Sequence, residues 1–285
     1  MEFQTPQDIR REYPNGVREL TDGGTWNTIA GQPTDDSEMA LMLARMLADS
    51  GKYDPQDAKK AYVFWLESEP FDCGMTVSSG LRGYPNPESQ ANGAMMRVSP
   101  LGIFGWKHDL SKVAEWACRD AALTHPHPIC QQANALFVMA IAHAILTGCE
   151  AQVLYERILR WAEDMQVDQD LLDAVRDAAA APPADYVQQQ GWVLTALGNA
   201  LWQLLHAENL EDAVVDTVMR GGDTDTNAAI CGTLLGAVSG RQAIPNQWLE
   251  SLLNCRPIPG LPGVHNPRPE CFWPVDALEL AERLL

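Results

Sequence analysis

Basic residues are few in this sequence of 285 residues, which has 20 Lys and Arg against 38 Asp and Glu. The formal net charge of −18 argues against non-specific binding to nucleic acid, because such binding needs a basic surface. A small anionic ligand is still compatible with this charge, because a metal ion or a helix N-terminus can supply local positive potential.

Membrane-spanning and secretory segments are also missing from the pattern. No apolar run approaches the ~20 residues that cross a membrane, and the polar start Met1-Glu2-Phe3-Gln4 does not resemble a signal peptide. The seven cysteines are scattered without a C-x-x-C pair, which argues against a zinc site and a disulfide framework. We therefore expect reduced thiols, no membrane contact and a cytoplasmic protein.

Sustained β-alternation is absent, and helical periodicity runs along most of the chain. Two of the helical segments are apolar nearly all round, which predicts buried central helices. No linker or internal repeat interrupts the pattern, so we expect one compact all-α domain over residues 1–285, with a long loop region at 72–100 that could contain one short helix. The predicted helices cover residues 35–49, 55–67, 110–123, 129–147 (central), 150–166, 169–180, 188–206 (central), 210–219, 228–238 and 275–284, with another beginning at Pro245.

The most informative motif is Gly-Gly-Asp-Thr-Asp-Thr-Asn at residues 221–227. Its carboxylates, Asp223 and Asp225, lie beside two threonine hydroxyls, and hard cations such as Mg²⁺, Mn²⁺ and Ca²⁺ take oxygen ligands. An EF-hand counted from Asp223 would need Gly at position 6 and Glu at position 12. Those positions hold Ala228 and Leu234, so the motif is not a calcium loop of that kind.

A second acidic motif, Thr34-Asp35-Asp36-Ser37-Glu38, opens the helix predicted at 35–49. Each motif could simply cap its own helix, since Asp, Thr and Asn accept hydrogen bonds from free N–H groups. A cap needs only one acid, however, and adjacent carboxylates repel unless a cation lies between them. The two motifs together therefore favour a shared metal site over two independent caps.

Two other features lie near helix starts. The turn Thr124-His125-Pro126-His127-Pro128 fits a surface turn and a ligand-facing loop equally well. Trp192 stands out among the tryptophans because it lies in a glutamine-rich entry to a predicted central helix. No phosphate-binding P-loop, dinucleotide-binding glycine motif or G-x-S-x-G nucleophile elbow is present.

Four motifs follow one another along the chain: Thr34-Asp35-Asp36-Ser37-Glu38-Met39-Ala40-Leu41, Asn92-Gly93-Ala94-Met95-Met96-Arg97, Thr124-His125-Pro126 and Gly221-Gly222-Asp223-Thr224-Asp225-Thr226-Asn227. Their order and spacing resemble the ADP-ribosylglycohydrolase family over nearly the whole chain. The bacterial type of that family reactivates dinitrogenase reductase. The resemblance implies an all-α orthogonal helical bundle with a binuclear site for two divalent cations, Mg²⁺ or Mn²⁺.

The resemblance also implies roles for individual residues. Asp72, in Pro70-Phe71-Asp72-Cys73-Gly74, matches a catalytic aspartate, and Glu2 matches an acid that acts in catalysis or as a lid. Family members usually begin with an apolar helix before that acid, and without it we expect Glu2 to be poorly fixed. The implied metal ligands are Thr34, Asp35, Asp36, Asp223, Asp225 and Thr226. The implied ligand-binding residues are Asn92, Gly93, Met96, His125 and Trp192.

The activity that the resemblance implies is metal-dependent hydrolysis of the bond between the distal ribose of ADP-ribose and a protein side chain, arginine by default. The partners would be an ADP-ribosylated protein as substrate and ADP-ribose as product. One alternative is a non-catalytic relative that only binds ADP-ribose. Others are hydrolysis of another ADP-ribosylated substrate, linked through serine, a nucleic acid or a metabolite, and a metal hydrolase that releases phosphate from a nucleotide.

Overall fold

The computed structural model describes residues 1–285, and its regular secondary structure is helical. The strand-like pairings are two isolated bridges, Gly23 with Thr28 and Ala91 with Trp192, so the predicted all-α fold class is confirmed. The helices are α1 (Pro6–Glu12), α2 (Asp35–Ser50), α3 (Pro55–Glu67), α4 (Met75–Leu81), α5 (Ser99–Gly105), α6 (Leu110–Ala121), α7 (Pro128–Thr147), α8 (Ala151–Asp164), α9 (Gln169–Asp177), α10 (Val193–His206), α11 (Leu210–Met219), α12 (Thr224–Ser239), α13 (Asn246–Asn254) and α14 (Ala277–Leu284), with 3₁₀ turns at Arg241–Ala243, Glu270–Phe272 and Pro274–Asp276.

The helix ends follow local chemistry that the sequence displays. Asp54 caps α3 by accepting a hydrogen bond from the backbone N–H of Gln56, and Pro55 occupies the first turn, where no N–H is needed. At their C-terminal ends, α2 stops at Gly51 and α7 stops at Gly148. Both glycines have a positive φ, of 65° and 61° respectively. Glycine adopts this left-handed conformation without steric cost, which explains why both helices stop where they do.

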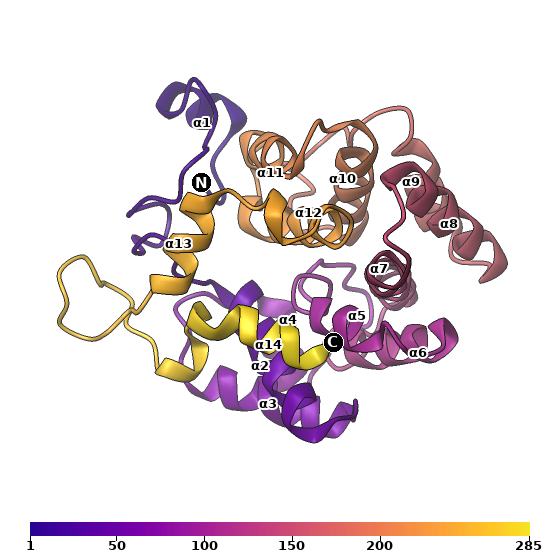
Figure 1. Ribbon diagram of the computed structural model, residues 1–285, viewed down its shortest axis with the longest axis horizontal. Helices are drawn as coiled ribbons and strands as arrows, with labels where there is room; N and C mark the ends of the chain where they lie inside the picture. Colours follow the sequence, from indigo (N-terminus) through magenta and orange to yellow (C-terminus); the bar gives the residue numbers. More distant parts are fainter.

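The two apolar helices, α7 and α10, lie at the centre of the fold, as predicted. α7 packs against α5, α6, α8, α10 and α12, and α10 also packs against α9 and α12 (Figure 1). By length and composition alone, α7 could cross a membrane, which corrects the expectation that no apolar run was long enough. Within the fold, 72% of its apolar window is buried, as a core helix requires.

The two helices that begin with acidic motifs, α2 and α12, come from distant parts of the sequence and contact each other directly. Figure 1 shows α12 grouped with α10 and α11, and α2 grouped with α3 and α14, on opposite sides of the site region. The N-terminal ends of α2 and α12 therefore lie close together, which positions the functional site described below.

Several boundaries differ from the sequence prediction. Helices α1 and α5 were not predicted, since each has only 7 residues and too short a pattern to detect. Helix α10 begins at Val193 and not at residue 188, because Trp192 pairs with Ala91 in a bridge that interrupts helical geometry. Helix α12 begins at Thr224 and not at residue 228, so the polar motif forms its first turn.

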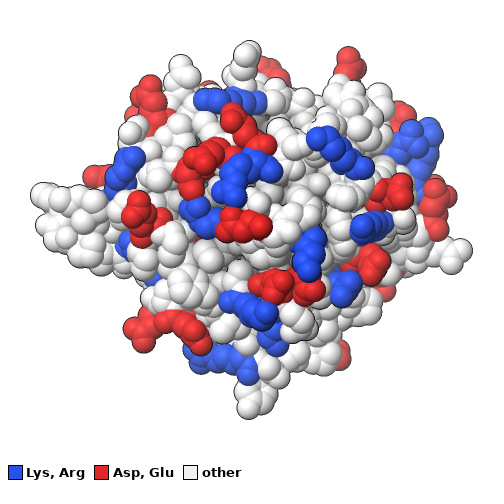
Figure 2. Space-filling model, turned by 60° about the horizontal axis from the view of Figure 1, so that its bottom comes forward, with Lys and Arg blue, Asp and Glu red and all other residues white.

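Surface charge is mixed on the face that Figure 2 shows, where Lys and Arg side chains are interspersed with Asp and Glu. Several basic residues form ion pairs within their own helices, such as Lys60 with Asp57 and Arg119 with Glu115. A broad basic surface of the kind that holds nucleic acid non-specifically is not seen on this face.

Candidate active site

A cavity of about 520 Å³ opens where the first turns of α2 and α12 meet. Six other regions of the chain complete its wall, so residues far apart in sequence face one space: residues 2–3, 26, 72–77, 91–96, 125 and 190–191. Ten of the residues singled out from sequence line it: Glu2, Asp35, Asp72, Asn92, Gly93, Met96, His125, Asp223, Asp225 and Thr226.

The first turn of α2 does not form a conventional side-chain cap. Thr34 occupies the N-cap position, but its hydroxyl donates to Asp36 Oδ2 at 3.0 Å and caps no backbone N–H. Asp36 is buried beneath the cavity, with 3% of its surface exposed, and its Oδ1 has no hydrogen-bond partner. Glu38 points away to a buried partner, Arg268. The capping interpretation therefore fails for this motif.

The first turn of α12 is approached by a tight glycine entry. Gly222 has φ of 75°, and a Cβ there would lie 1.9 Å from the carbonyl oxygen of Tyr186. The chain turns at this point so that Asp223 accepts a hydrogen bond from Asn92 Nδ2 at 2.8 Å and caps no helix N–H. Asp225 follows in the first turn, and its Oδ1 also has no partner.

Glu2 is held firmly at the rim of the cavity, contrary to the expectation of a poorly fixed residue. The N–H of Phe3 donates to the carbonyl of Gly222 at 2.7 Å, and the N–H of Gly222 donates to the carbonyl of Gln4 at 3.0 Å. Trp26 Nε1 also donates to Glu2 Oε2 at 2.6 Å. These bonds tie the N-terminal segment to the acidic motif of α12, and Glu2 is buried, with 8% of its surface exposed.

Asp72 enters the cavity from the loop between α3 and α4. One carboxylate oxygen each from Glu2, Asp72 and Asp225 lie within 4.8 Å of one another. The same loop touches the α2 motif, since the N–H of Gly74 donates to Asp35 Oδ2 at 3.3 Å. The structure thus brings both residues expected to act in catalysis next to the residues expected to bind metal.

Burial and mutual repulsion raise the pKa values of these carboxyl groups. Burial is the first cause for every one, and it raises the pKa of Glu2 to about 9, of Asp72 to about 8, of Asp223 to about 7 and of Asp35 to about 6, with neighbouring carboxylates adding to each. The pKa values of Asp36 and Asp225 are also raised by burial. Protons or a cation must compensate this charge.

The donor set fits a hard divalent cation. No Lys or Arg lines the cavity, so the carboxylates have no basic side chain facing them there. The buried oxygens Asp36 Oδ1 and Asp225 Oδ1 lack any hydrogen-bond donor, which is costly unless another positive group approaches them. Thr34, Asp35, Asp36, Asp223, Asp225 and Thr226 supply only oxygen, the ligand type that Mg²⁺ and Mn²⁺ prefer.

His125 and Trp192 have different placements. His125 is fully buried and lines the cavity, and its Nδ1 hydrogen-bonds the hydroxyl of Thr124 at 2.7 Å, so a surface turn is wrong for it. Burial, then Arg97, lowers the pKa of His125 to about 3, so its ring is neutral. Trp192 does not line this cavity, because its Nε1 is bonded to Gln90 Oε1 at 2.8 Å and its ring faces a neighbouring hollow beside Pro183.

The cavity also contains residues that sequence reasoning missed. Trp26 binds Glu2, and Phe3 covers the rim with 56% of its surface exposed. Gln190 and Gly191 form another part of the wall, next to the bridge at Trp192. None of these residues belongs to a local motif. The one signal in the sequence was the glutamine-rich stretch before α10, which pointed to the neighbourhood of Gln190 and Gly191.

The raised pKa values predict an unusual pH dependence for the metal-free protein. The folded carboxyl groups keep protons that an unfolded chain releases near its ordinary pKa of 3.8 to 4.5. The folded state therefore binds more protons between about pH 4 and pH 9, and stability falls as pH rises, by about 1.4 kcal/mol per pH unit for each extra proton.

We expect thermal melts in EDTA to show a decreasing Tm from pH 5.5 to pH 8.5. Added Mg²⁺ should reverse the trend, because cation binding displaces the protons and is stronger at higher pH. A Tm in EDTA that increases over this pH interval would contradict the assigned charge cluster.

Comparison with known proteins gives a consistent result. The family model described as ADP-ribosylglycohydrolase matches residues 1–283. The ADP-ribosyl-[dinitrogen reductase] glycohydrolase of Rhodospirillum rubrum is 31% identical over 262 residues, covering 88% of this chain and 84% of that protein. The ADP-ribosylarginine hydrolase Tri1 of Pseudomonas putida (strain GB-1) is 26% identical, covering 83% of this chain and 66% of its own.

More distant relatives and solved structures agree. The ADP-ribosylhydrolase ARH3 of Gallus gallus is 23% identical, covering 84% of this chain and 78% of its own. A solved structure described as an ADP-ribosylglycohydrolase-related protein complex superposes with a TM-score of 0.76 at 26% identity, covering 93% of this chain and 86% of that one. The fold therefore has counterparts along nearly the full length of the chain.

Proposed function

The chain belongs to the ADP-ribosylglycohydrolase family and is a glycosidic-bond hydrolase of that family, and from this premise we propose its substrate and its metal dependence. We infer that it removes ADP-ribose from an arginine side chain of a modified protein, using two divalent cations, Mg²⁺ or Mn²⁺. The relative from Pseudomonas putida, named for ADP-ribosylarginine, supports arginine as the linkage. The relative from Rhodospirillum rubrum, named for dinitrogen reductase, supports a modified protein as the substrate.

The proposed metal dependence rests on two buried carboxylate oxygens that have no hydrogen-bond partner. Asp36 Oδ1 and Asp225 Oδ1 are buried without a donor, although they lie on two separate helix starts that meet at the cavity. A side chain that only caps a helix would accept from helix N–H groups at the N-cap position, and neither N-cap residue, Thr34 or Asp223, does so. We propose Thr34, Asp35, Asp36, Asp223, Asp225 and Thr226 as the ligands.

A divalent cation held by these residues would orient the ribose hydroxyls and lower the pKa of a bound water toward neutrality. The protein's own groups supply the proton transfer. Asp72 is positioned for it, because its carboxyl reaches the same space as Asp225 and burial raises its pKa to about 8, so that it can hold a proton near neutral pH. In the direction of cleavage, a protonated Asp72 gives its proton to the departing side-chain nitrogen.

Glu2 has a supporting part in this proposal. Its Oε2 is bound by Trp26 Nε1, and its carboxyl lies beside Asp72 and Asp225. Once it is ionised, as a bound cation would favour by lowering its raised pKa, it adds negative potential at the rim of the cavity. Cleavage at an anomeric carbon passes through an oxocarbenium-like transition state that carries positive charge. A carboxylate next to that carbon favours the transition state over the uncharged substrate.

The 92–96 loop and His125 provide a surface for the rest of ADP-ribose. Gly93 lets this loop pack closely on Val77 and His125, since a Cβ at this position would lie 3.0 Å from Val77 and 3.3 Å from the His125 ring. Asn92 already holds Asp223 by its side-chain amide, so ligand binding and metal binding share one residue. Neutral His125 has an unpartnered Nε2 that can bond a hydroxyl or phosphate oxygen.

The linkage is tested by offering the protein two synthetic peptides, one ADP-ribosylated on arginine and one on serine. With Mg²⁺ or Mn²⁺ present, we expect mass spectrometry to detect ADP-ribose released from the arginine peptide at a rate at least about 100-fold above the serine peptide, since discrimination by a built site reaches this range. Equal release from both peptides, or release from serine alone, would overturn the arginine assignment.

The binding-only alternative is separated by a melt and a turnover assay on one sample. A non-catalytic relative would show a Tm shift with ADP-ribose and Mg²⁺ but no release of ADP-ribose from either peptide. Our proposal requires both the shift and the release. Phosphate as the released product would instead indicate a hydrolase that acts on nucleotide phosphates.

A further inference from the structure

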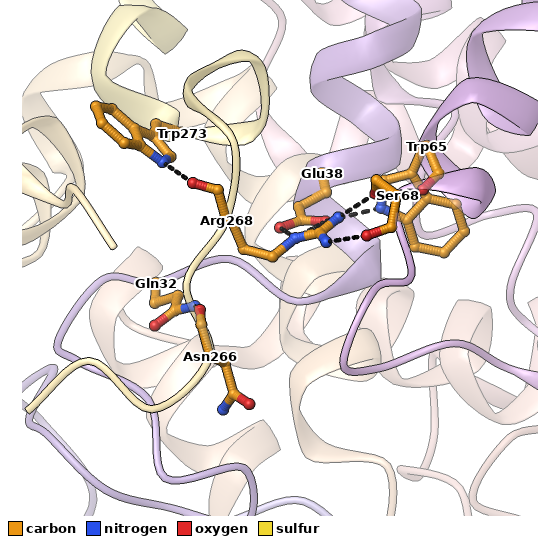
Figure 3. A network of polar contacts seen from close by, with 7 residues as sticks. All are labelled: Gln32, Glu38, Trp65, Ser68, Asn266, Arg268 and Trp273. Atoms are coloured by element: carbon orange, nitrogen blue, oxygen red, sulfur yellow. Dashed lines mark hydrogen bonds and ion pairs between the residues drawn. The ribbon is translucent and has the colours of Figure 1, made fainter. Parts of the chain in front are cut away.

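A buried ion pair lies behind the cavity wall, outside the residues that line it. Arg268 Nε donates to Glu38 Oε1 at 2.9 Å and Nη2 donates to Oε2 at 2.8 Å, so the guanidinium binds the carboxylate at two points (Figure 3). The side chains are 4% and 2% exposed. Glu38 lies in the first turn of α2 with Asp35, so the pair bears directly on the acidic motif.

The same guanidinium reaches a second element. Arg268 Nη2 donates to Ser68 Oγ at 2.7 Å, and Nη1 donates to the Ser68 carbonyl at 3.1 Å (Figure 3). Ser68 ends α3, and the chain then passes through Glu69, which has a positive φ of 54°, into the loop that carries Asp72. Arg268 thus joins α2 to the start of the Asp72 loop.

Asn266, two residues before Arg268, binds the part of the chain that carries Trp26, the hydrogen-bond partner of Glu2. Asn266 Nδ2 donates to the carbonyl of Trp26 at 2.6 Å, and the Asn266 carbonyl accepts from Gln32 Nε2 at 2.6 Å. Trp26 in turn binds Glu2. Residues 266–268, which we call the C-terminal strap, therefore contact the three parts of the chain that carry Asp35, Asp72 and the partner of Glu2.

The strap is itself fixed in place. The N–H of Arg268 donates to the Pro257 carbonyl at 3.0 Å, and its carbonyl accepts from Trp273 Nε1 at 2.7 Å. The guanidinium carbon lies 4.7 Å from the centre of the Phe272 ring. A buried ion pair adds little net stability compared with apolar packing, so what this arrangement contributes is a defined geometry.

We propose that Arg268 is a positioning residue for hydrolysis: by binding Glu38 and Ser68 together, it sets the placement of the Asp72 loop against the acidic motif of α2. The effect of Arg268 on kcat can be measured only if the function proposed above is right. Its effect on the placement of the loop does not depend on that function, because the coupling between the strap and residues 69–74 can be measured without a substrate.

The experiment compares two neutralised ion pairs. In Arg268→Met with Glu38→Gln, no unpaired buried charge remains, so the fold is kept while the bonds to Ser68 are lost. The matched control is Arg45→Met with Asp276→Asn. Arg45 also joins α2 to the C-terminal region, through Asp276 Oδ1 at 2.9 Å and the Cys271 carbonyl at 3.1 Å, but it contacts neither Ser68 nor the strap.

Hydrogen exchange followed by mass spectrometry should show the backbone amides of residues 69 and 71–74 exchanging at least about 10-fold faster in the Arg268 double variant, and unchanged in the control. On the arginine peptide, kcat should fall by about 10- to 100-fold with KM within about 3-fold, because the binding surface is intact while reacting groups are displaced. Arg268→Lys, which keeps the charge but loses the two-point bond, should give an intermediate kcat.

Unchanged exchange at 69–74 would overturn the inference, as would faster exchange with wild-type kcat, or an equal loss of kcat in the control. If the wild-type protein releases no ADP-ribose, the proposed function fails, and the exchange comparison still decides whether Arg268 positions the loop. If the Arg268 double variant does not fold, the same comparison is made with Arg268→Lys, for which wild-type exchange and kcat would overturn the proposal.

Discussion

Asp225→Asn is expected to lower kcat/KM by about 10³-fold and to abolish detectable Mn²⁺ binding. Asp225 is the acid shared by both halves of the site, since its carboxylate lies beside Asp72 and Glu2 and its Oδ1 has no donor in the protein. A bound cation contributes several kcal/mol of transition-state stabilisation, and each 1.36 kcal/mol is a factor of ten. Asparagine has the same shape but cannot supply the negative charge.

Asp225→Asn should raise thermal stability in EDTA and lower it in the presence of Mn²⁺. In EDTA at pH 8, Asp225→Asn should raise Tm, because it removes one of several repelling buried carboxylates. In Mn²⁺ it should lower Tm relative to wild type, because the ligand is lost. Asp170→Asn, an exposed carboxylate on α9, is the control and should change neither. Full activity in Asp225→Asn would remove the metal site from the mechanism.

Asp72→Asn is expected to lower kcat by about 10²- to 10⁴-fold, the range that general acid–base catalysis contributes. In contrast with Asp225→Asn, it should keep Mn²⁺ binding, because Asp72 lies outside the proposed ligand set. The measurement pairs single-turnover kinetics on the arginine peptide with calorimetric titration of Mn²⁺. Loss of Mn²⁺ binding together with activity would show that Asp72 is a ligand and not the proton donor.

Most of the fold could be predicted from sequence because long apolar periodic segments determine it. The central helices α7 and α10 and the amphipathic helix α3 were found from their patterns alone, and Gly148 marked a true helix end. The 7-residue helices α1 and α5 were missed, because so short a pattern does not differ from a loop. The start of α10 was misplaced because the bridge between Ala91 and Trp192 is a tertiary contact.

The acidic residues at the centre of the site could be predicted from sequence, whereas the residues that hold them in place could not. Asp35 and Asp223 stand in dense local motifs, so residue type and spacing were enough to bring them together. The fixing of Glu2 depends on Trp26 and on backbone bonds to Gly222, which join segments far apart along the chain. Arg268 carries no local pattern at all, and its pairing with Glu38 becomes visible only in three dimensions.

The dependence of hydrolysis on two bound cations is tested most directly by measuring the number of bound cations and the rate of turnover in one titration. Protein stripped with EDTA is titrated with Mn²⁺ while bound metal and ADP-ribose release from the arginine peptide are measured together. The account predicts no release from the stripped protein and a rate that rises with occupancy and saturates at two Mn²⁺ per chain. Release at the full rate in EDTA, with no Mn²⁺ bound, would contradict it.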